Sequence, residues 1–292
     1  MIATILNVHS SVECGLDTLD SIKTYVGDNV VLLVDGLNWN DWKDVENTCK
    51  LKGFRHGIPK SPYRNVALGL KEAYEMWGNE VDWFFYTEYD ALVTSERFKI
   101  NLKMAEEKGI WMLGNDGHVA GEAITLIQAM LGESFRSSYY LLGCCQFFHK
   151  DFMKKLADIN FFERFLNLTN GFSDGYFPFY SGYDLSEHMY PTLCRHFGGN
   201  IGVFAHFDEL KKWHGSYQYF PVRWKPEIDF ETENFPNPSI IHPLKENSHP
   251  LRVLHRERRN QWKNFKKKES QLDSFLMSQS DMPKTDDVLL IH

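Results

Sequence analysis

The sequence predicts an α/β protein with a mixed, mainly parallel sheet and flanking helices. Within residues 1–115, short apolar segments alternate with helix-length amphipathic segments, which is typical of strand–helix–strand units. No polar residue interrupts residues 83–86, as expected of a strand that is covered on both faces. One of these segments, residues 83–86, stops at Glu88 and Asp90, and ligands of open α/β sheets bind where the strands end.

The individual elements are predicted from apolar spacing. In the first half we expect strands at residues 2–8, 30–34, 54–57, 82–86 and 110–113, and helices at residues 15–26, 39–52, 65–77 and 96–108. In the second half we expect a long strand at residues 139–148, helices at 150–159 and 184–197, and short strands at 200–203 and 240–242. Residues 170–183 and 221–238 read as irregular segments, and we expect the last ~20 residues to be disordered.

Composition limits the class of protein. A hydrophobic content of 43% provides a core, and no run of eighteen apolar residues predicts a membrane span. The net charge of −7 argues against a general nucleic-acid binder. Residues 1–6 read as a first strand and not as a signal sequence. The five cysteines lack metal-ligand spacing, and we expect the adjacent pair Cys144 and Cys145 to be small buried residues without a disulfide. These features predict a cytoplasmic protein.

Charge is unevenly distributed along the chain. Residues 251–268 carry eight basic side chains against one acidic one, so the rest of the chain is strongly acidic. Aromatic and aliphatic residues are interspersed among these cations, as in helices that bind anionic lipid surfaces. The alternative is a solvated helix that packs on the acidic part of the protein. We therefore divide the chain into a catalytic domain at residues 1–245 and a basic helical segment with a polar tail at residues 246–292, with peripheral membrane contact left open.

The acidic pair after the strand at residues 82–86 suits a metal. Glu88 and Asp90 are two residues apart, so their side chains leave the same side of an extended backbone. Two carboxylates at a strand end suit a divalent cation that itself binds phosphates. An isolated Glu-x-Asp is more often a pair of solvated loop acids, and this reading stays open from the pair alone.

Other motifs follow in an order that resembles GT-A glycosyltransferases, most closely the inverting, family-two-type enzymes. These motifs are His9-Ser10-Ser11, Val34-Asp35-Gly36, Arg64-Asn65-Val66-Ala67, Thr87-Glu88-Tyr89-Asp90, Leu142-Gly143 and Gly182-Tyr183-Asp184-Leu185. The resemblance covers roughly residues 1–245. It departs from the family pattern where Glu88 replaces an aspartate, where Tyr183 precedes the expected catalytic base, and in an insert around residues 114–136.

The resemblance implies a metal-dependent, inverting transfer of a sugar from a nucleotide-diphosphate donor to a glycan or lipid-linked acceptor. Under this hypothesis the metal is Mn²⁺ or Mg²⁺. The implied roles are metal binding by Asp90 and His242, nucleotide binding by His9, Ser10, Asp35, Arg64 and Glu88, phosphate binding by Lys245, and general-base catalysis by Asp184.

Each role has a simpler alternative. Asp184 is also a good N-cap for the helix that follows it, with Asp174 as the second candidate for the base. His242 is equally explained as a strand-end histidine, and Asp35 before Gly36 as a turn.

Two other functions remain open from the sequence. One is a non-catalytic carbohydrate-binding or scaffolding relative, which the departures at Glu88 and Tyr183 allow. The other is a sugar-nucleotide pyrophosphorylase, although the chain has no glycine-rich phosphate loop after its first strand.

Overall fold

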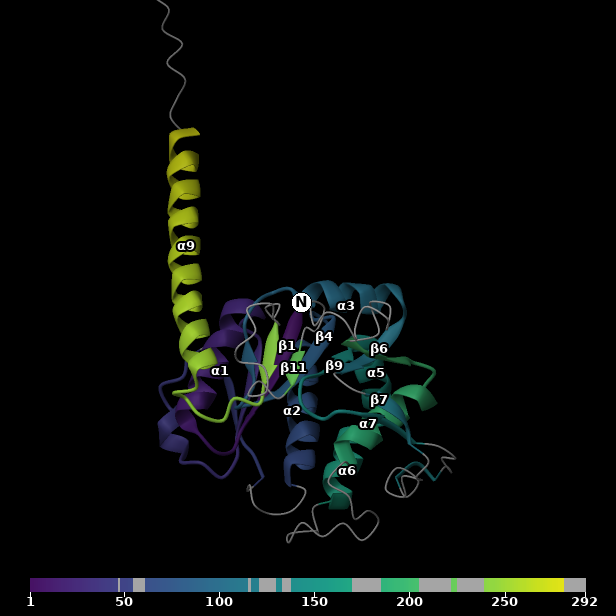
Figure 1. Ribbon diagram of the computed structural model, residues 1–292. Helices are drawn as coiled ribbons and strands as arrows, with labels where there is room; N and C mark the ends of the chain where they lie inside the picture. Colours follow the sequence, from purple (N-terminus) through teal and green to yellow (C-terminus); the bar gives the residue numbers. More distant parts are fainter. Residues whose placement is uncertain are drawn as a thin grey trace, which may run out of the picture.

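The computed structural model describes residues 1–46, 48–54, 61–114, 117–120, 130–132, 138–169, 185–204, 222–224 and 239–280. Its centre is a seven-stranded sheet with the order β10-β6-β9-β4-β1-β2-β3 (Figure 1). The strands are β1 (Ile2–Val8), β2 (Val30–Val34), β3 (Cys49–Lys52), β4 (Trp83–Glu88), β6 (Ile110–Gly114), β9 (Gln146–His149) and β10 (Asn200–Val203). Only β9 runs antiparallel to its neighbours in this sheet. The predicted mixed, mainly parallel α/β fold is therefore confirmed, and it is consistent with a GT-A or Rossmann-like arrangement.

Helices cover both faces of this sheet. The helices are α1 (Val12–Tyr25), α2 (Ser61–Trp77), α3 (Phe98–Glu107), α5 (Lys150–Asp158), α6 (Phe161–Thr169), α7 (Leu185–His196) and α9 (Pro250–Ser280), with a 3₁₀ turn, η1 (Trp39–Trp42). Helices α2, α5, α6 and α7 pack on one face, and α1 and α3 pack on the other. Alternate residues of each central strand therefore enter two separate cores.

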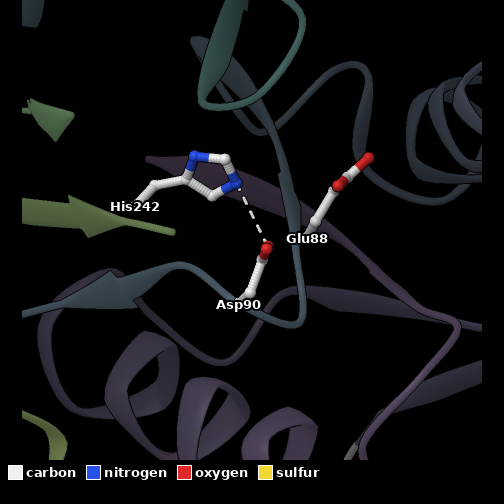
Figure 2. A group of neighbouring side chains, drawn as sticks. All are labelled: Glu88, Asp90 and His242. Atoms are coloured by element: carbon white, nitrogen blue, oxygen red, sulfur yellow. Dashed lines mark ion pairs between the residues drawn. The ribbon is translucent and has the colours of Figure 1, made fainter. Parts of the chain in front are cut away.

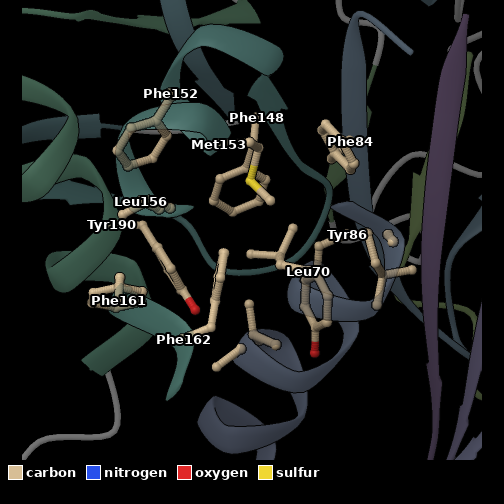
Figure 3. Close-up of a cluster of buried hydrophobic side chains, with 14 of the residues drawn as sticks. Leu70, Phe84, Tyr86, Phe148, Phe152, Met153, Leu156, Phe161, Phe162 and Tyr190 are labelled. Carbon is tan, nitrogen blue, oxygen red and sulfur yellow. The ribbon is translucent and has the colours of Figure 1, made fainter. Parts of the chain in front are cut away.

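The first of these cores is rich in aromatic side chains. Phe84 and Tyr86 point from β4 toward α2, and Phe148 stands next to Phe152 of α5 (Figure 3). Helix α2 lies close against the sheet at Gly69, where a Cβ atom would come within 2.9 Å of Leu33. This close packing fixes the strand ends that carry the polar residues described below.

Two predicted elements are wrong. The helix expected at residues 39–52 is replaced by η1 and by β3, which pairs with β2 at the edge of the sheet. Period-two alternation of Cys49 and Leu51 with Lys50 and Lys52 accounts for the strand, because the two apolar side chains pack against the core.

The long strand expected at residues 139–148 is interrupted. It divides into β8 (Ser138–Leu141) and β9, because Cys145 adopts a left-handed backbone conformation (φ 62°) that a strand does not accommodate. All five cysteines are free thiols, and the predicted buried pair Cys144 and Cys145 is confirmed, with the sulfur atoms 3.4 Å apart.

Smaller elements complete the fold. Strands β5 (Leu92–Val93), β11 (Val222–Trp224) and β12 (Ile240–His242) form a three-stranded sheet, and β7 (Gly117–Ala120) pairs with β8. Helix α9 begins against α1 and then projects away from the rest of the protein, as the yellow ribbon of Figure 1 shows. It continues to Ser280, so the disorder expected for the last ~20 residues is wrong for the part that precedes residue 281, and residues 281–292 lie outside the described residues. None of the helices in the described ranges combines the length and apolar character needed to cross a membrane.

Candidate metal and nucleotide site

The predicted acidic pair lies where β4 ends. The strand is buried from Trp83 to Thr87, and Glu88 is its last residue. The amide of Tyr89 still donates to the carbonyl of Asn7 in β1 (2.9 Å), and the amide of Ala91 closes a turn on the carbonyl of Glu88 (3.0 Å). Asp90 therefore sits in a tight turn between β4 and β5, with both flanking strands fixed.

His242 reaches this turn through strand pairing. Ile241 of β12 lies opposite Leu92 of β5 in an antiparallel register, so the next residue, His242, lies beside the turn. The amide of Leu244 donates to the carbonyl of Asp90 at 2.6 Å, which holds the returning chain in place. Nε2 of His242 is 3.1 Å from Oδ1 of Asp90 (Figure 2).

Glu88, Asp90 and His242 form one cluster, in which a ligand atom of each lies within 4.8 Å of the others. Asp90 and His242 are buried, and Glu88 is partly buried. The Glu88 carboxylate accepts a hydrogen bond from the hydroxyl of Tyr86 (3.1 Å). Two carboxylates and an imidazole make a donor set that suits Mn²⁺ and related divalent ions, so the residues fit the predicted metal.

The charges of this cluster are coupled. Burial alone would raise the pKa of Asp90, but its hydrogen bond with His242 and the imidazolium charge hold that pKa below its ordinary value. Burial alone would lower the pKa of His242, but the neighbouring Cys144 and Asp90 raise it above its ordinary value. The pair is therefore a carboxylate and an imidazolium at neutral pH, and a metal that binds here must displace the proton of the imidazole.

His9 and Ser10 lie beside the cluster, at the end of β1. Nε2 of His9 is 3.8 Å from a carboxylate oxygen of Glu88, and its ring meets the ring of Tyr89 edge-on at 4.7 Å. Burial alone would lower the pKa of His9, but the nearby carboxylates of Glu88, Asp90 and Asp35 raise it. Ser10 hydrogen-bonds the side chain of Tyr89.

Asp35 follows β2 and is fully buried. Next to it, a pocket of about 300 Å³ is lined by Val34, Gly36, Leu37, Trp39, Lys52 and Gly53. Gly53 closes on Asp35 so tightly that a Cβ atom there would lie 3.0 Å from the Asp35 side chain. Parallel strands β4, β1 and β2 are consecutive in the sheet, so this pocket and the Glu88–Asp90–His242 cluster lie along the same edge.

The other residues predicted for the site are Arg64, Lys245 and Asp184, with Asp174 as the alternative base. Arg64 stacks on the ring of Phe54 (3.9 Å) and donates to the carbonyl of Thr169 (3.0 Å), which directs its guanidinium to the C-terminal end of α6. Lys245 is exposed, three residues after His242. Asp184 and Asp174 lie outside the described residues.

The described part of the chain resumes after Asp184 with helix α7. This helix begins at Leu185, and Glu187 in its first turn accepts a hydrogen bond from the amide of Gly143. The next residue, Cys144, is buried and contributes to the raised pKa of His242. The first turn of α7 is therefore linked to the Glu88–Asp90–His242 cluster through two adjacent residues.

Sequence reasoning missed two buried asparagines at this edge. Nδ2 of Asn65 lies 3.4 Å from Oδ1 of Asn7, and Oδ1 of Asn65 accepts from the amide of Phe54 (2.7 Å). These contacts connect β1, α2 and the segment after β3. The sequence does contain a signal for this contact, because Asn7 is a polar residue near the end of a mostly apolar strand. A buried polar side chain is expected to hydrogen-bond a neighbouring polar group.

Comparisons with known proteins add only general likeness. No family model matches the chain, and no curated protein sequence matches it. Among solved structures, the glycosyltransferase GlyE of Streptococcus pneumoniae TIGR4 aligns with a TM-score of 0.42 and 9% identity, over 89% of this chain and 60% of that chain. This chain thus spans less than two thirds of GlyE.

Two nucleotidyltransferases are also similar. The 4-diphosphocytidyl-2C-methyl-D-erythritol synthase of Anaerococcus prevotii aligns with a TM-score of 0.37 and 13% identity, over 70% of this chain and 87% of that chain. The bifunctional IspDF of Campylobacter jejuni aligns with a TM-score of 0.36 and 12% identity, over 69% of this chain and 48% of that chain. The chemistry proposed below rests on the residues of this chain.

Proposed function

We propose that the protein is a metal-dependent glycosyltransferase that moves a sugar from a nucleoside-diphosphate donor to a glycan or lipid-linked acceptor. One observation carries the proposal. Glu88, Asp90 and His242, which come from two distant parts of the sequence, converge at the carboxyl edge of a mainly parallel sheet, on the same edge as the pocket beside Asp35.

The donor site divides along this edge. Asp90 and His242 hold the divalent metal, Mn²⁺ or Mg²⁺, and Glu88 contacts the ribose or the metal through water. Such a metal supplies charge that stabilises the departing diphosphate. His9, whose raised pKa favours its cationic form, donates to a phosphate oxygen, and the exposed Lys245 serves the same purpose.

The nucleotide end of the donor occupies the pocket beside Asp35. Trp39 lines this pocket and offers a flat wall for a base. A direct contact of Asp35 with the base or ribose requires the strand end to open, because its side chain is fully buried. Ser10 supports this edge through Tyr89. A direct contact of Arg64 with the nucleotide requires its side chain to leave the ring of Phe54, so this role is the least supported of the set.

Transfer with inversion needs one carboxylate that removes the proton of the acceptor hydroxyl as its oxygen attacks the anomeric carbon. We assign this role to Asp184, which precedes α7. In the first turn of α7, Glu187 accepts a hydrogen bond from the amide of Gly143, next to Cys144.

The outer part of α9 is the proposed contact with an anionic membrane, where a lipid-linked acceptor would lie. Half of the basic residues of this segment already pair with aspartates of α1, so they are not counted as contacts with lipid headgroups. They are Arg252, Arg256, Arg259 and Lys263. Trp262 and Phe265, on either side of Lys263 in the sequence, are exposed, and their ring centroids lie 6.0 Å apart, close to Lys267 and Lys268 in the sequence. Aromatic side chains flanked by cations suit a lipid headgroup region.

Nucleotide binding tests this proposal. Thermal unfolding is measured with UDP, GDP, CDP and dTDP, each with and without Mn²⁺, for wild type and Asp90→Asn. A ligand at about 100 times its dissociation constant adds roughly 2.7 kcal/mol to the free energy of unfolding. We expect one nucleotide to stabilise the wild type only with Mn²⁺, and the variant to lose this effect.

Two results favour the other functions. Stabilisation by a free glycan, without metal or nucleotide, supports the carbohydrate-binding relative. Release of pyrophosphate from a nucleoside triphosphate and a sugar phosphate supports the pyrophosphorylase. The absence of any nucleotide effect contradicts the transferase.

A further inference from the structure

A buried arginine joins the two segments that carry the proposed metal ligands. Arg252 lies in the first turn of α9, and its side chain is fully buried between α9, α1 and the turn after β4. A buried guanidinium is costly unless all its donors are used, so its hydrogen bonds identify what it does.

One side of the guanidinium holds the Asp90 turn. Nη2 of Arg252 donates to the carbonyl of Tyr89 at 2.9 Å. The same nitrogen lies 3.2 Å from the hydroxyl of Thr18, which in turn lies 2.7 Å from the carbonyl of Tyr89 and 2.5 Å from that of Ala91. The residues before and after Asp90 are thus both fixed by polar contacts.

Another side holds the segment that carries His242. Nε of Arg252 donates to the carbonyl of Leu244 at 3.0 Å, and the amide of Leu244 donates to the carbonyl of Asp90 at 2.6 Å. The chain after β12 is therefore held between the guanidinium and the turn. His242 lies two residues before this contact.

The third side satisfies the charge. Nη1 of Arg252 donates to Oδ2 of Asp17 at 2.8 Å. Burial alone would raise the pKa of Asp17, but hydrogen bonds and charges from Arg256, Arg259 and Arg252 hold it below its ordinary value, so Asp17 remains a carboxylate.

We infer that Arg252 is a positioning residue for the metal site: it sets the distance between the Asp90 turn and the His242 segment, and so makes helix α9 part of the catalytic unit. The inference rests on the proposed function. It requires arginine, because three nitrogens of one planar group donate in three directions, and a lysine ammonium has one position from which to donate.

Arg259 provides a matched control. It is on the same helix, its side chain is equally buried, and it also pairs with Asp17. Its Nε donates to Asp20 at 3.0 Å, so its contacts lie on α1 and away from the Asp90 turn. Arg252→Lys and Arg259→Lys both keep a positive charge and both disturb the packing of α9 on α1.

The experiment compares the full chain of wild type with both variants. Electron paramagnetic resonance of free Mn²⁺ gives the Mn²⁺ dissociation constant. The thermal midpoint and the rate of amide exchange at Leu244 are measured as well. Loss of a group that hydrogen-bonds a metal-binding segment typically weakens metal affinity roughly 10–100-fold. We expect this loss, with faster exchange at Leu244, in Arg252→Lys only. Both variants are expected to lower the thermal midpoint.

The outcomes separate the two claims. If wild type binds Mn²⁺ and both variants weaken binding equally, or neither does, the positioning role is wrong while the proposed function stands. If wild type binds no Mn²⁺, the proposed function and the inference both fail. If Arg252→Lys does not fold, Thr18→Val replaces it, because Thr18 also contacts the carbonyl of Tyr89 and carries no charge. Unchanged Mn²⁺ affinity in Thr18→Val then overturns the inference.

Discussion

At the scale of single residues, the structure brings Asp90 and His242 to 3.1 Å although they are far apart in the sequence. A buried carboxylate next to an imidazolium is stable without a metal, so the pair alone does not require one. Glu88 adds a second carboxylate within 4.8 Å of the other two ligand groups, and two carboxylates with an imidazole form a donor set that suits a divalent cation.

Replacement of Asp90 tests whether this residue binds the metal. Asp90→Asn removes a negative donor, so we expect Mn²⁺ affinity to fall by more than the roughly 10–100-fold that follows from losing a group that only supports a ligand. Asp82→Asn is the control, because Asp82 is a half-exposed acid that pairs with Lys150 before β4 begins. Calorimetric titration with Mn²⁺ measures both, and equal affinities for Asp90→Asn and wild type would exclude Asp90 as a ligand.

The pH dependence of metal binding is a second prediction for these residues. Because the folded pKa of His242 is raised, its ion pair with Asp90 stabilises the metal-free protein fully below the unfolded pKa of about 6.5 and loses this effect as pH rises through the folded pKa. Metal binding must displace that proton, so Mn²⁺ affinity should increase with pH, by up to about tenfold per unit.

Titration in buffers of different ionisation enthalpy counts the protons released. About one proton per bound Mn²⁺ is expected at neutral pH in wild type. Affinity that does not change between pH 6 and pH 8 would show that His242 is not a ligand.

At the scale of elements, the helix α9 is tied to α1 by ion pairs and not by apolar contacts alone. Asp17 pairs with Arg252, Arg256 and Arg259, of which the first and last are buried. In this first part of α9, the basic residues that suggest a membrane helix in the sequence are partners of the acidic residues Asp17 and Asp20 of α1. Packing on the acidic part of the protein thus applies to the first half of residues 251–268, and membrane contact stays a prediction for the second half.

Removing the shared carboxylate should therefore be costly. Asp17→Asn leaves buried arginines without their counter-ion, and such losses cost about 3–5 kcal/mol. Asp20→Asn is the control on the same helix, since the Asp20 side chain is 42% exposed and its loss should cost about 1 kcal/mol or less. Chemical denaturation measures both, and a similar small cost for the two variants would contradict this view of the α1–α9 contact.

Substitution of the exposed aromatic residues of α9 should have the opposite effect: little change in stability and a loss of vesicle binding. Substituting Trp262 and Phe265 together by alanine removes exposed side chains, so stability should change by less than about 0.5 kcal/mol. Co-sedimentation with anionic vesicles should fall strongly in the same variant, and neutral vesicles serve as the control. Vesicle binding equal to that of wild type would show that Trp262 and Phe265 do not contact the membrane.

The elements also show what local sequence determines. Apolar runs such as residues 30–34 and 83–86 predict their strands correctly because burial on both faces leaves no other pattern. The segment at residues 39–52 misled because its two tryptophans have helical spacing, whereas Trp42 is buried by a single 3₁₀ turn that Asn38 caps. The break before β9 depends on the left-handed conformation of Cys145, which its residue type does not suggest.

At the scale of the whole molecule, the candidate site depends on topology. The sequence indicates Glu88 and Asp90 as a pair, because strand ends and spacing are local properties. It names His242 only through resemblance, since the pairing of β12 with β5 joins segments that are far apart in the sequence. The role of Arg252 is likewise invisible in the sequence, where it is one of eight basic residues in a charged stretch.

The central claim is that the Glu88–Asp90–His242 cluster holds a divalent metal that binds a nucleoside diphosphate. Crystals grown with Mn²⁺ and the nucleotide selected by thermal stabilisation, measured at the manganese absorption edge, test it most directly. We expect an anomalous peak bound by Asp90 and His242 and shared with the diphosphate, with the base in the pocket beside Asp35. A peak at other residues, or nucleotide bound away from this edge of the sheet, would contradict the account.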